Sequence, residues 1–271
     1  MENNFSVKDK NIIISGGTGV LGKAIAAHLA REGANMIILG RNASKVNALV
    51  EEIKNEGGSA HAAVADVTQE DQLQKIKNTL SQEFGHIDIL INAAGGNMPG
   101  AIVAPDQTIA DLSGEAVKSI MDLNYLGTFL PIKVFLPLLQ AAANGNIINI
   151  SSMAASRPLT RVMGYASAKA AVDNLTKWMA IEFAQKFGPG MRVNAVAPGF
   201  FLTEQNRSLL TEQDGSLSAR GNQIIGHTPM ARFGKPEDLF GTIQWLCSDA
   251  SKFVTGTIIP VDGGFSAYSG V

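Results

Sequence analysis

Cysteine is almost missing from this chain of 271 residues, in which Cys247 is the only one. A single cysteine excludes an internal disulfide framework and favours a reducing compartment. We expect the Cys247 side chain to be a small buried hydrophobic group. Histidine is scarce too, and the four histidines (His28, His61, His86 and His227) lack the spacing of metal ligands. The sequence therefore predicts no metal site.

Long hydrophobic runs are missing as well. The most apolar stretch, residues 129–143, contains Lys133 and two prolines and is too short to cross a bilayer. No early segment has the basic-then-apolar pattern of a signal peptide. We therefore expect a cytoplasmic protein that does not associate with a membrane.

An excess of charge of one sign is also missing. The chain has 22 basic and 24 acidic residues, which leave a formal net charge of −2. This balance gives no electrostatic reason to expect nucleic acid or an anionic surface as a partner. We therefore expect no nucleic acid partner.

Short apolar runs alternate with longer amphipathic segments along the whole chain. The apolar runs are continuous, as is typical of strands covered on both faces. They predict strands at 11–15, 35–39, 60–64, 87–91, 146–150, 191–196 and 257–261. Helical patterns lie near 20–32, 43–56, 69–84, 114–142, 164–187 and 236–248. The alternation predicts an α/β fold with a doubly wound, parallel, seven-stranded sheet of the Rossmann type, as a single domain over residues 1–271.

One long stretch, about 198–235, has no clear periodicity. A segment of this length inside a compact domain is usually a lid or disordered. We expect a lid over the substrate.

The segment SGGTGVLG, residues 15–22, follows the first apolar run. Gly17, Gly19 and Gly22 match the dinucleotide-binding spacing G-x-G-x-x-G. In an open parallel sheet this turn is the natural phosphate site, because backbone N–H groups and the helix dipole favour an anion there. Glycine lets the backbone approach closely and adopt a positive φ. The segment therefore indicates a bound dinucleotide.

The second half of the chain carries groups suited to proton transfer. Tyr165 and Lys169 are four residues apart on a predicted helix, so they share one face. A neighbouring ammonium stabilises a phenolate, which lowers the high pKa of a phenol. Ser152 follows a predicted strand and offers a hydroxyl that can bind a carbonyl or an alcohol. Together these groups fit proton transfer that accompanies hydride transfer.

These pieces resemble the short-chain dehydrogenase/reductase family over nearly the whole chain. The resemblance is carried by SGGTGVLG, ADV at 65–67, NAAG at 92–95, Asn124, NISS ending at Ser152, YASAK at 165–169, APG at 197–199 and VDGG at 261–264.

The resemblance implies a homotetramer, a nicotinamide cofactor and the catalytic set Asn124, Ser152, Tyr165 and Lys169. Tyr165 would be the acid/base, and Lys169 would lower its pKa and bind the nicotinamide ribose. Ser152 would orient the substrate, and Asn124 would hold a water of the proton relay. The cofactor-binding residues expected are Ser15, Gly16, Thr18, Gly19, Val20, Leu21, Arg41, Asn42, Asp66, Val67, Asn92, Ala93, Ala94, Gly95, Tyr165, Lys169, Pro198, Gly199, Phe201 and Thr203.

The chain departs from the family pattern at two places. The usual turn, T-G-x-x-x-G-x-G, has a glycine where this chain has Val20 and a threonine where it has Ser15. The backbone donors survive this change, and we expect the valine side chain to point into the helix packing. Ala93 replaces the second asparagine of the usual N-N-A-G, which is a minor change.

A looser resemblance concerns the substrate. The segments GGTGVLG, NAAGGNMPGA, PGFFLTEQNRSLL, HTPMARFGKPEDL and VDGGFSAYSGV resemble the D-mannonate oxidoreductase (fructuronate reductase) branch, which interconverts D-mannonate and D-fructuronate. A sugar acid requires a cation for its carboxylate and polar groups for its hydroxyls. The residues expected to supply them are Gly96, Asn97, Ser152, Arg157, Gln205, Asn206 and Arg207, with Arg161 in the same loop as Arg157.

The end of the second predicted strand bears on cofactor choice. An acidic residue about 20 positions beyond the glycine turn usually binds the ribose 2′-hydroxyl of NAD. Gly40 stands at that position here, and Arg41 follows it. Arg41 can bind a 2′-phosphate or stack on the adenine. We expect a preference for NADP, with NAD as the second choice.

Two alternatives remain open. The first is another short-chain enzyme, such as a gluconate, acyl-carrier or hydroxysteroid reductase, although the basic patch that would dock an acyl carrier is not evident. The second is a nucleotide-binding sensor without turnover, since a fold does not determine a function. A sensor does not require the Asn124, Ser152, Tyr165 and Lys169 set.

Overall fold

Seven parallel strands form one sheet in the computed structural model, which describes residues 3–270. The strands are β1 (Asn11–Ser15), β2 (Asn35–Gly40), β3 (Ser59–Val64), β4 (Ile89–Asn92), β5 (Asn146–Ile150), β6 (Arg192–Pro198) and β7 (Ile258–Val261). Their order is β3-β2-β1-β4-β5-β6-β7. The order reverses between β1 and β4, so a crevice for a ligand is expected at their carboxyl ends.

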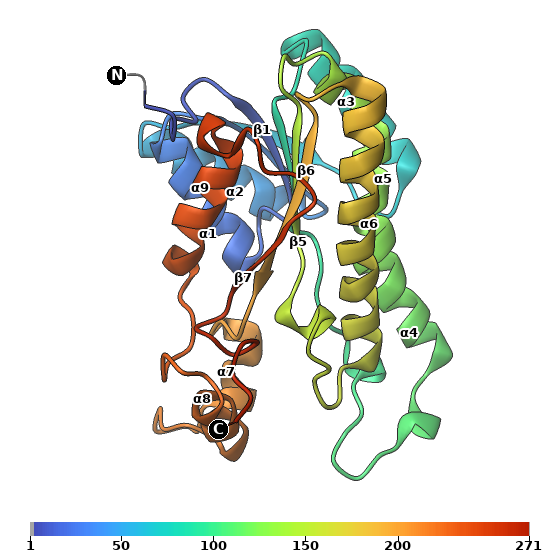
Figure 1. The fold of residues 1–271 in the computed structure, drawn as a ribbon, viewed down its shortest axis with the longest axis vertical. Helices are drawn as coiled ribbons and strands as arrows, with labels where there is room; N and C mark the ends of the chain where they lie inside the picture. Colours follow the sequence, from blue (N-terminus) through green and yellow to red (C-terminus); the bar gives the residue numbers. More distant parts are fainter. Residues whose placement is uncertain (1–2, 271) are drawn as a thin grey trace.

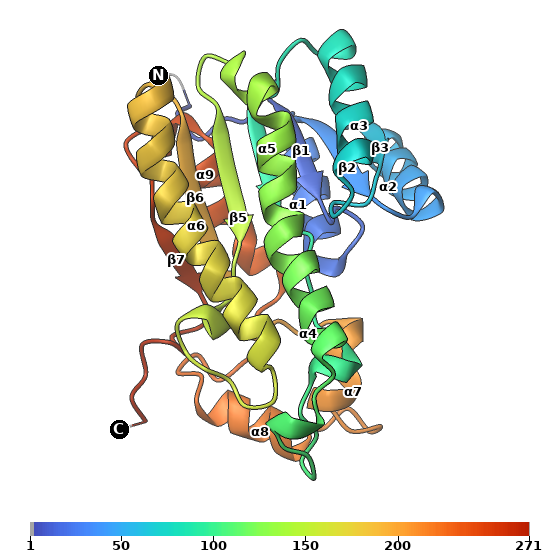
Figure 2. The same ribbon diagram turned by 90° about the vertical axis from the view of Figure 1, so that its right-hand side faces the viewer.

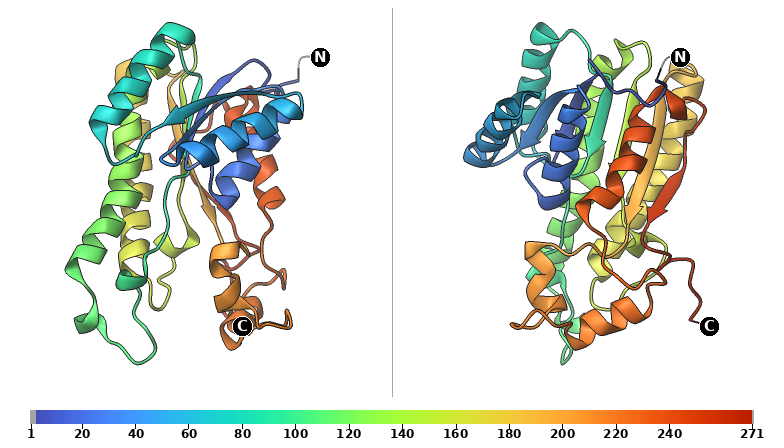
Figure 3. Two further views of the ribbon diagram at one scale, coloured as in Figure 1. Left: turned by 180° about the vertical axis from the view of Figure 1, so that it is seen from behind. Right: turned by 90° about the vertical axis from the view of Figure 1, so that its left-hand side faces the viewer.

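Helices cover both faces of the sheet (Figures 1 and 3). One face carries α1 (Val20–Arg31), α2 (Ala43–Asn55) and α9 (Phe240–Cys247). The other carries α3 (Glu70–Glu83), α5 (Gly127–Gln140) and α6 (Met163–Phe187). The shorter helices α4 (Gly114–Met121), α7 (Glu204–Leu210) and α8 (Ala219–Gly226) gather near the carboxyl ends of the strands, at the bottom of Figure 2. The predicted doubly wound α/β fold is confirmed.

The core consists of two apolar layers, one on each face of the sheet. Ile12 and Ile14 of β1 point into the layer under α1 and α9, whereas Ile13 between them points into the layer under α5 and α6. This alternation explains why the strands read as continuous apolar runs. Cys247 lies in the first layer and is buried, as expected, and burial raises the pKa of its thiol to about 12.

Two predicted elements need correction. The helix expected over 114–142 is divided by a single π-helical turn, η3 (Asp122–Leu126), between α4 and α5. The stretch 198–235, expected to be irregular, contains α7 and α8. Each of these helices is too short to give a clear periodicity, and each depends on its cap. The Thr203 N–H donates to Asn206 Oδ1 at 2.8 Å, and Ser218 Oγ accepts from the Gly221 N–H at 3.1 Å. The lid role of this stretch stays a prediction.

None of the helices within residues 3–270 is both long enough and apolar enough to span a membrane.

Candidate active site

The glycine turn between β1 and α1 is shaped for close approach of backbone. Gly16 has a φ of +66°, and a Cβ atom there would lie 2.6 Å from the Ala94 nitrogen. A Cβ atom at Gly22 would lie 2.2 Å from the Gly16 carbonyl oxygen. Gly19 caps α1 without a side-chain hydrogen bond, which leaves the first N–H groups of the helix for a ligand. The turn therefore fits the pyrophosphate of a dinucleotide.

Val20 does not point into the helix packing, which corrects the expectation for this residue. It is 38% exposed, whereas the buried face of α1 contains Gly22, Ile25 and Leu29. A valine is tolerated at this family glycine position because the side chain stands outside the turn and leaves the backbone donors in place.

The residues at the ends of β2 and β3 form the part of the crevice that is expected to face the adenosine. Arg41 is exposed, and a Cβ atom at Gly40 would lie 3.5 Å from Thr18 Oγ1. Asn42 caps α2 by accepting the Lys45 N–H at 3.0 Å. Asp66 Oδ1 accepts from the backbone and hydroxyl of Thr68. The Asn42 and Asp66 side chains therefore stabilise the segments that follow β2 and β3.

A polar contact joins β4 to its neighbour β5. Asn92 Nδ2 donates to Asn149 Oδ1 at 2.9 Å, while the buried Asn92 Oδ1 has no hydrogen-bond partner among the residues that the structure describes. The Ala94 N–H donates to Ser15 Oγ at 3.3 Å, which fastens the chain after β4 to the end of β1. These contacts place Gly95 and Gly96 at the opening of the crevice.

A pocket of about 350 Å³ lies at the carboxyl ends of β4, β5 and β6. It brings together three predicted catalytic residues, Ser152, Tyr165 and Lys169. The other predicted cofactor residues that line it are Leu21, Ala93, Gly95, Pro198, Gly199, Phe201 and Thr203. The predicted cofactor residues outside its lining are Ser15, Gly16, Thr18, Gly19, Val20, Arg41, Asn42, Asp66, Val67, Asn92 and Ala94, which lie at or just beyond the ends of β1 to β4.

Tyr165 and Lys169 stand one turn apart at the start of α6. The Lys169 Nζ atom lies 5.8 Å from the centroid of the Tyr165 ring and donates to the Ile150 carbonyl at 2.7 Å. Burial lowers the pKa of Lys169 to about 8, and the nearby Asp173 carboxylate opposes that shift. Burial raises the pKa of Tyr165, and a hydrogen bond with Ser152 opposes the rise. At neutral pH the pair therefore consists of a protonated phenol and an ammonium, as an acid catalyst requires.

Asn124 lies beneath the pocket, in the π turn η3, and is fully buried. Its Nδ2 donates to the carbonyls of Gly96 and Ile120, both at 2.9 Å, and its Oδ1 accepts from the Gly96 N–H at 3.1 Å. A Cβ atom at Gly95 would lie 2.7 Å from Asn124 Oδ1. The amide therefore holds the loop that forms one wall of the pocket. The water expected at Asn124 stays a prediction.

The predicted substrate residues separate into two groups. Gly96, Asn97, Ser152 and Asn206 line the pocket. The Asn206 amide is already engaged, because it also donates to the Phe201 carbonyl at 2.8 Å.

Neither Arg157 nor Arg207 is among the described residues that line the pocket. Arg157 Nε donates instead to the Ser266 carbonyl at 2.9 Å, and Arg207 is exposed on α7. The side chain of Gln205 lies outside the described part of the chain. The sequence predicted that Arg157 or Arg207 would bind the substrate carboxylate. If the carboxylate binds in this pocket, another residue has to provide the positive charge.

Arg220 is the charged pocket residue that sequence reasoning missed. It is half-buried in the first turn of α8. Burial and the charge of the nearby Arg161 both lower its pKa. Within the described chain, neither guanidinium has a hydrogen bond or an ion pair. Sequence reasoning could not find it, because the place of Arg220 in the pocket depends on α8, which is too short to show a periodic pattern.

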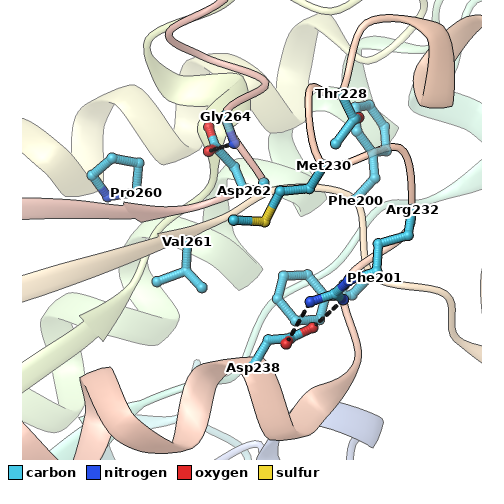
Figure 4. A pocket seen from close by; sticks show the side chains of 12 residues that line it. Phe200, Phe201, Thr228, Met230, Arg232, Asp238, Pro260, Val261, Asp262 and Gly264 are labelled. Carbon is cyan, nitrogen blue, oxygen red and sulfur yellow. Dashed lines mark hydrogen bonds and ion pairs between the residues drawn. The ribbon is translucent and has the colours of Figure 1, made fainter.

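A second pocket, of about 370 Å³, lies behind Phe200 and Phe201 (Figure 4). Its charged pair, Arg232 and Asp238, forms two hydrogen bonds of 2.6 and 2.9 Å and is self-neutralised. The Asp262 carboxylate is likewise engaged with the N–H groups of Gly264 and Ser266. This pocket contains none of the predicted catalytic groups, so the first pocket is the candidate active site. No group of three or more potential metal ligands occurs among the side chains that the structure describes.

The chain is similar to several known proteins. The family model described as Enoyl-(Acyl carrier protein) reductase matches residues 18–266. The chain is 47% identical to UxuB of Bacillus subtilis, an uncharacterized oxidoreductase, over 97% of this chain and 96% of the relative.

Two solved structures resemble the whole chain. A Haemophilus influenzae protein, provisionally called a D-mannonate oxidoreductase and solved with NAD, is 41% identical, with a TM-score of 0.92 and 98% coverage of both chains. A gluconate 5-dehydrogenase from Burkholderia cenocepacia, solved with NADP and tartrate, is 31% identical, with a TM-score of 0.87 and 98% coverage of both chains. The chain therefore belongs to the short-chain dehydrogenase/reductase family and is an NAD(P)-dependent oxidoreductase acting on alcohol and ketone groups.

Proposed function

We propose that the enzyme interconverts a sugar acid and its keto form, with D-mannonate and D-fructuronate as the pair. The observation that carries this proposal is Arg220, a half-buried guanidinium without an acidic partner among the described residues, in the same pocket as Ser152 and Tyr165. A guanidinium matches a carboxylate in shape and charge. The second cation, Arg161, strengthens the attraction for an anion.

In this reaction Ser152 and Tyr165 bind the reacting oxygen. During reduction Tyr165 donates its proton to the carbonyl oxygen, and during oxidation the phenolate takes the hydroxyl proton back. The Lys169 ammonium stabilises that phenolate. A bound nicotinamide supplies or accepts the hydride. Arg220 holds the carboxylate, which sets the carbon that faces the cofactor.

The relatives support a hydroxy-acid substrate. The Haemophilus protein bears the name of a D-mannonate oxidoreductase, and the Burkholderia enzyme is a gluconate dehydrogenase solved with tartrate. Gluconate is therefore the second candidate substrate.

A panel of D-mannonate, D-gluconate and D-mannitol, each with NADP and NAD, tests the proposal. D-mannitol is the matched control, because it keeps the hydroxyls of mannonate and lacks the carboxylate. We expect D-mannonate to have the highest kcat/KM. A faster reaction with D-gluconate moves the assignment to the second candidate, and equal rates with D-mannitol contradict an acid-specific site.

We also propose that NADP is preferred and that the enzyme is a homotetramer. The missing acidic side chain at Gly40 and the exposed Arg41 support NADP. The relatives are solved with either cofactor, so they support the cofactor class alone. Trp178 and Ile181 of α6 are 56% and 62% exposed, which supports an interface between copies of the chain. Light scattering coupled to size exclusion tests the tetramer.

A further inference from the structure

Three polar contacts tie the end of β5 to α6. Lys169 Nζ donates to the Ile150 carbonyl at 2.7 Å, and Asn149 Nδ2 donates to Thr176 Oγ1 at 2.8 Å. Between them, Ser151 Oγ donates to Asp173 Oδ1. Lys169, Asp173 and Thr176 share one face of the helix because they are spaced by four and three residues. Figure 2 shows α6 running alongside β5.

Ser151 stands between two residues that the chemistry uses. The carbonyl of Ile150, before it, accepts from the Lys169 ammonium. The hydroxyl of Ser152, after it, meets Tyr165. Ser151 itself is buried, so its hydrogen bond to Asp173 is the side-chain anchor of this segment. A shift of Ser151 would move both neighbours relative to α6.

Asp173 also carries charge next to the catalytic lysine. It is half-buried, and burial raises the pKa of its carboxyl, whereas the hydrogen bond from Ser151 and the charges of Lys177 and Lys169 oppose that rise. Burial lowers the pKa of Lys169, and among the described residues the Asp173 carboxylate is the charged group that opposes this shift. The other polar groups that meet at Lys169 are uncharged: the Ile150 carbonyl from β5 and the Tyr165 phenol one turn earlier on α6.

We propose that Asp173 is a positioning residue for the proton transfer. Its carboxylate holds Ser151, which places the Ile150 carbonyl on Lys169 and the Ser152 hydroxyl at Tyr165. Its negative charge favours the protonated form of Lys169, the form that stabilises the Tyr165 phenolate. Asp173 touches neither substrate nor cofactor in this assignment. The proposal rests on the oxidoreductase activity of the family and is independent of the substrate.

The two roles of Asp173 can be separated by substitution. Asp173→Asn keeps an oxygen that accepts from Ser151 and removes the charge. Ser151→Ala removes the hydrogen bond and keeps the charge. Glu182→Gln is the matched control, since Glu182 is a carboxylate of the same helix, far along α6, that pairs with Lys186.

The experiment measures kcat for ketone reduction against pH, together with the cofactor Kd and the Tm of each variant. We expect Asp173→Asn to move the alkaline limit of kcat about 0.5–1 pH unit lower, because the neighbouring charge that favours the ammonium is gone. Ser151→Ala should lower kcat roughly tenfold without moving that limit, as expected for misplaced catalytic groups. Glu182→Gln should have the same kcat and the same alkaline limit as the wild type.

An Asp173→Asn enzyme with the wild-type pH profile, whether or not its Tm falls, overturns the proposal and leaves Asp173 a structural residue. If Asp173→Asn does not fold, Asp173→Ser is measured in the same way, because it is smaller and also uncharged. A ketone other than a sugar acid serves equally well in the assay, so failure of the substrate assignment leaves this test intact.

Discussion

The Lys169 ammonium is held by the Ile150 carbonyl at 2.7 Å and lies 5.8 Å from the centroid of the Tyr165 ring. The lysine is thus fixed by backbone from the neighbouring strand, independently of the phenol that it serves. A contact of this kind keeps the ammonium in place when the tyrosine is changed.

We therefore expect Tyr165→Phe to lower kcat by about 10² to 10⁴ while the cofactor Kd changes little, because only the proton-carrying hydroxyl is lost. Lys169→Ala should impair both quantities, since the ammonium acts on the phenol and is predicted to bind the ribose. Steady-state kinetics and fluorescence titration with reduced cofactor measure the two effects. Turnover at the wild-type rate in Tyr165→Phe would remove the tyrosine from the mechanism.

The glycine turn predicts a second pair of variants. A Cβ atom at Gly22 would lie 2.2 Å from the Gly16 carbonyl oxygen, a backbone atom that cannot move aside cheaply. Gly22→Ala should weaken cofactor binding at least about tenfold, because the turn must open where the phosphate is expected to bind.

Gly241→Ala in α9 is the matched control, since no described atom outside the neighbouring backbone of its own helix lies within 4 Å of its added Cβ. It should raise stability by about 0.5–1 kcal/mol, because alanine favours a helix over glycine. Unchanged cofactor affinity in Gly22→Ala would show that the turn is not the phosphate site.

The place of Arg220 in the pocket leads to a prediction about KM for acidic and for uncharged substrates. Arg220→Ala should raise KM for D-mannonate about 10- to 100-fold, because hydrogen bonds to charged groups contribute about 1.5–3 kcal/mol. KM for an uncharged ketone should change little. Arg207→Ala is the control, since this arginine is exposed on α7. Equal losses with charged and uncharged substrates would assign Arg220 a structural role.

Cofactor preference is predicted to depend on Gly40. An aspartate there restores the acceptor for a ribose diol and repels a 2′-phosphate, so Gly40→Asp should shift the ratio of kcat/KM values toward NAD. The added Cβ would lie 3.0 Å from Val46 Cγ2, a side-chain contact that a small shift relieves. The kinetics of the wild type and of Gly40→Asp are measured with both cofactors. Arg41→Ala is measured in the same way and should raise KM for NADP alone. A wild-type preference for NAD would contradict this assignment.

The buried thiol predicts how stability depends on pH. The pKa of Cys247 is raised from 9.0 to about 12 in the folded chain. Between those values the folded state holds a proton that the unfolded state has lost, so the free energy of unfolding falls as pH rises. The effect should be absent in Cys247→Ala, and denaturant titrations of both proteins at alkaline pH measure it. In the native wild type, the thiol should react with a disulfide reagent only on unfolding.

The sheet could be predicted because its central strands are covered on both faces, whereas the edge strands β3 and β7 are less buried. Runs such as Asn11–Ser15 and Asn146–Ile150 therefore carry their own apolar signature, and the seven strands lie close to the ranges expected. The convergence of Ser152, Tyr165 and Lys169 followed from the resemblance and from the common edge of a parallel sheet.

Other features of the site could not be predicted from the sequence, because they depend on contacts between residues that are far apart in the chain. Arg157 is drawn to Ser266 near the end of the chain, and Arg220 enters the pocket only because α8 folds back over it. Asn124 could be named from the resemblance, but not its three hydrogen bonds to Gly96 and Ile120, which depend on the π turn. Short helices and local changes of helical pitch leave no periodic pattern in the sequence.

The π turn Asp122–Leu126 has a consequence for how the helix tolerates changes of length. A π turn closes its hydrogen bonds over one residue more than an α turn does. Deletion of a single residue within it would restore a regular helix and leave α4 and α5 in nearly their present orientation, because the turn already accommodates the additional residue. Such a deletion should therefore displace Asn124 and the loop that it holds while sparing the packing of both helices. The turn is thus a place where the length of the chain can change by one residue without disturbing the core.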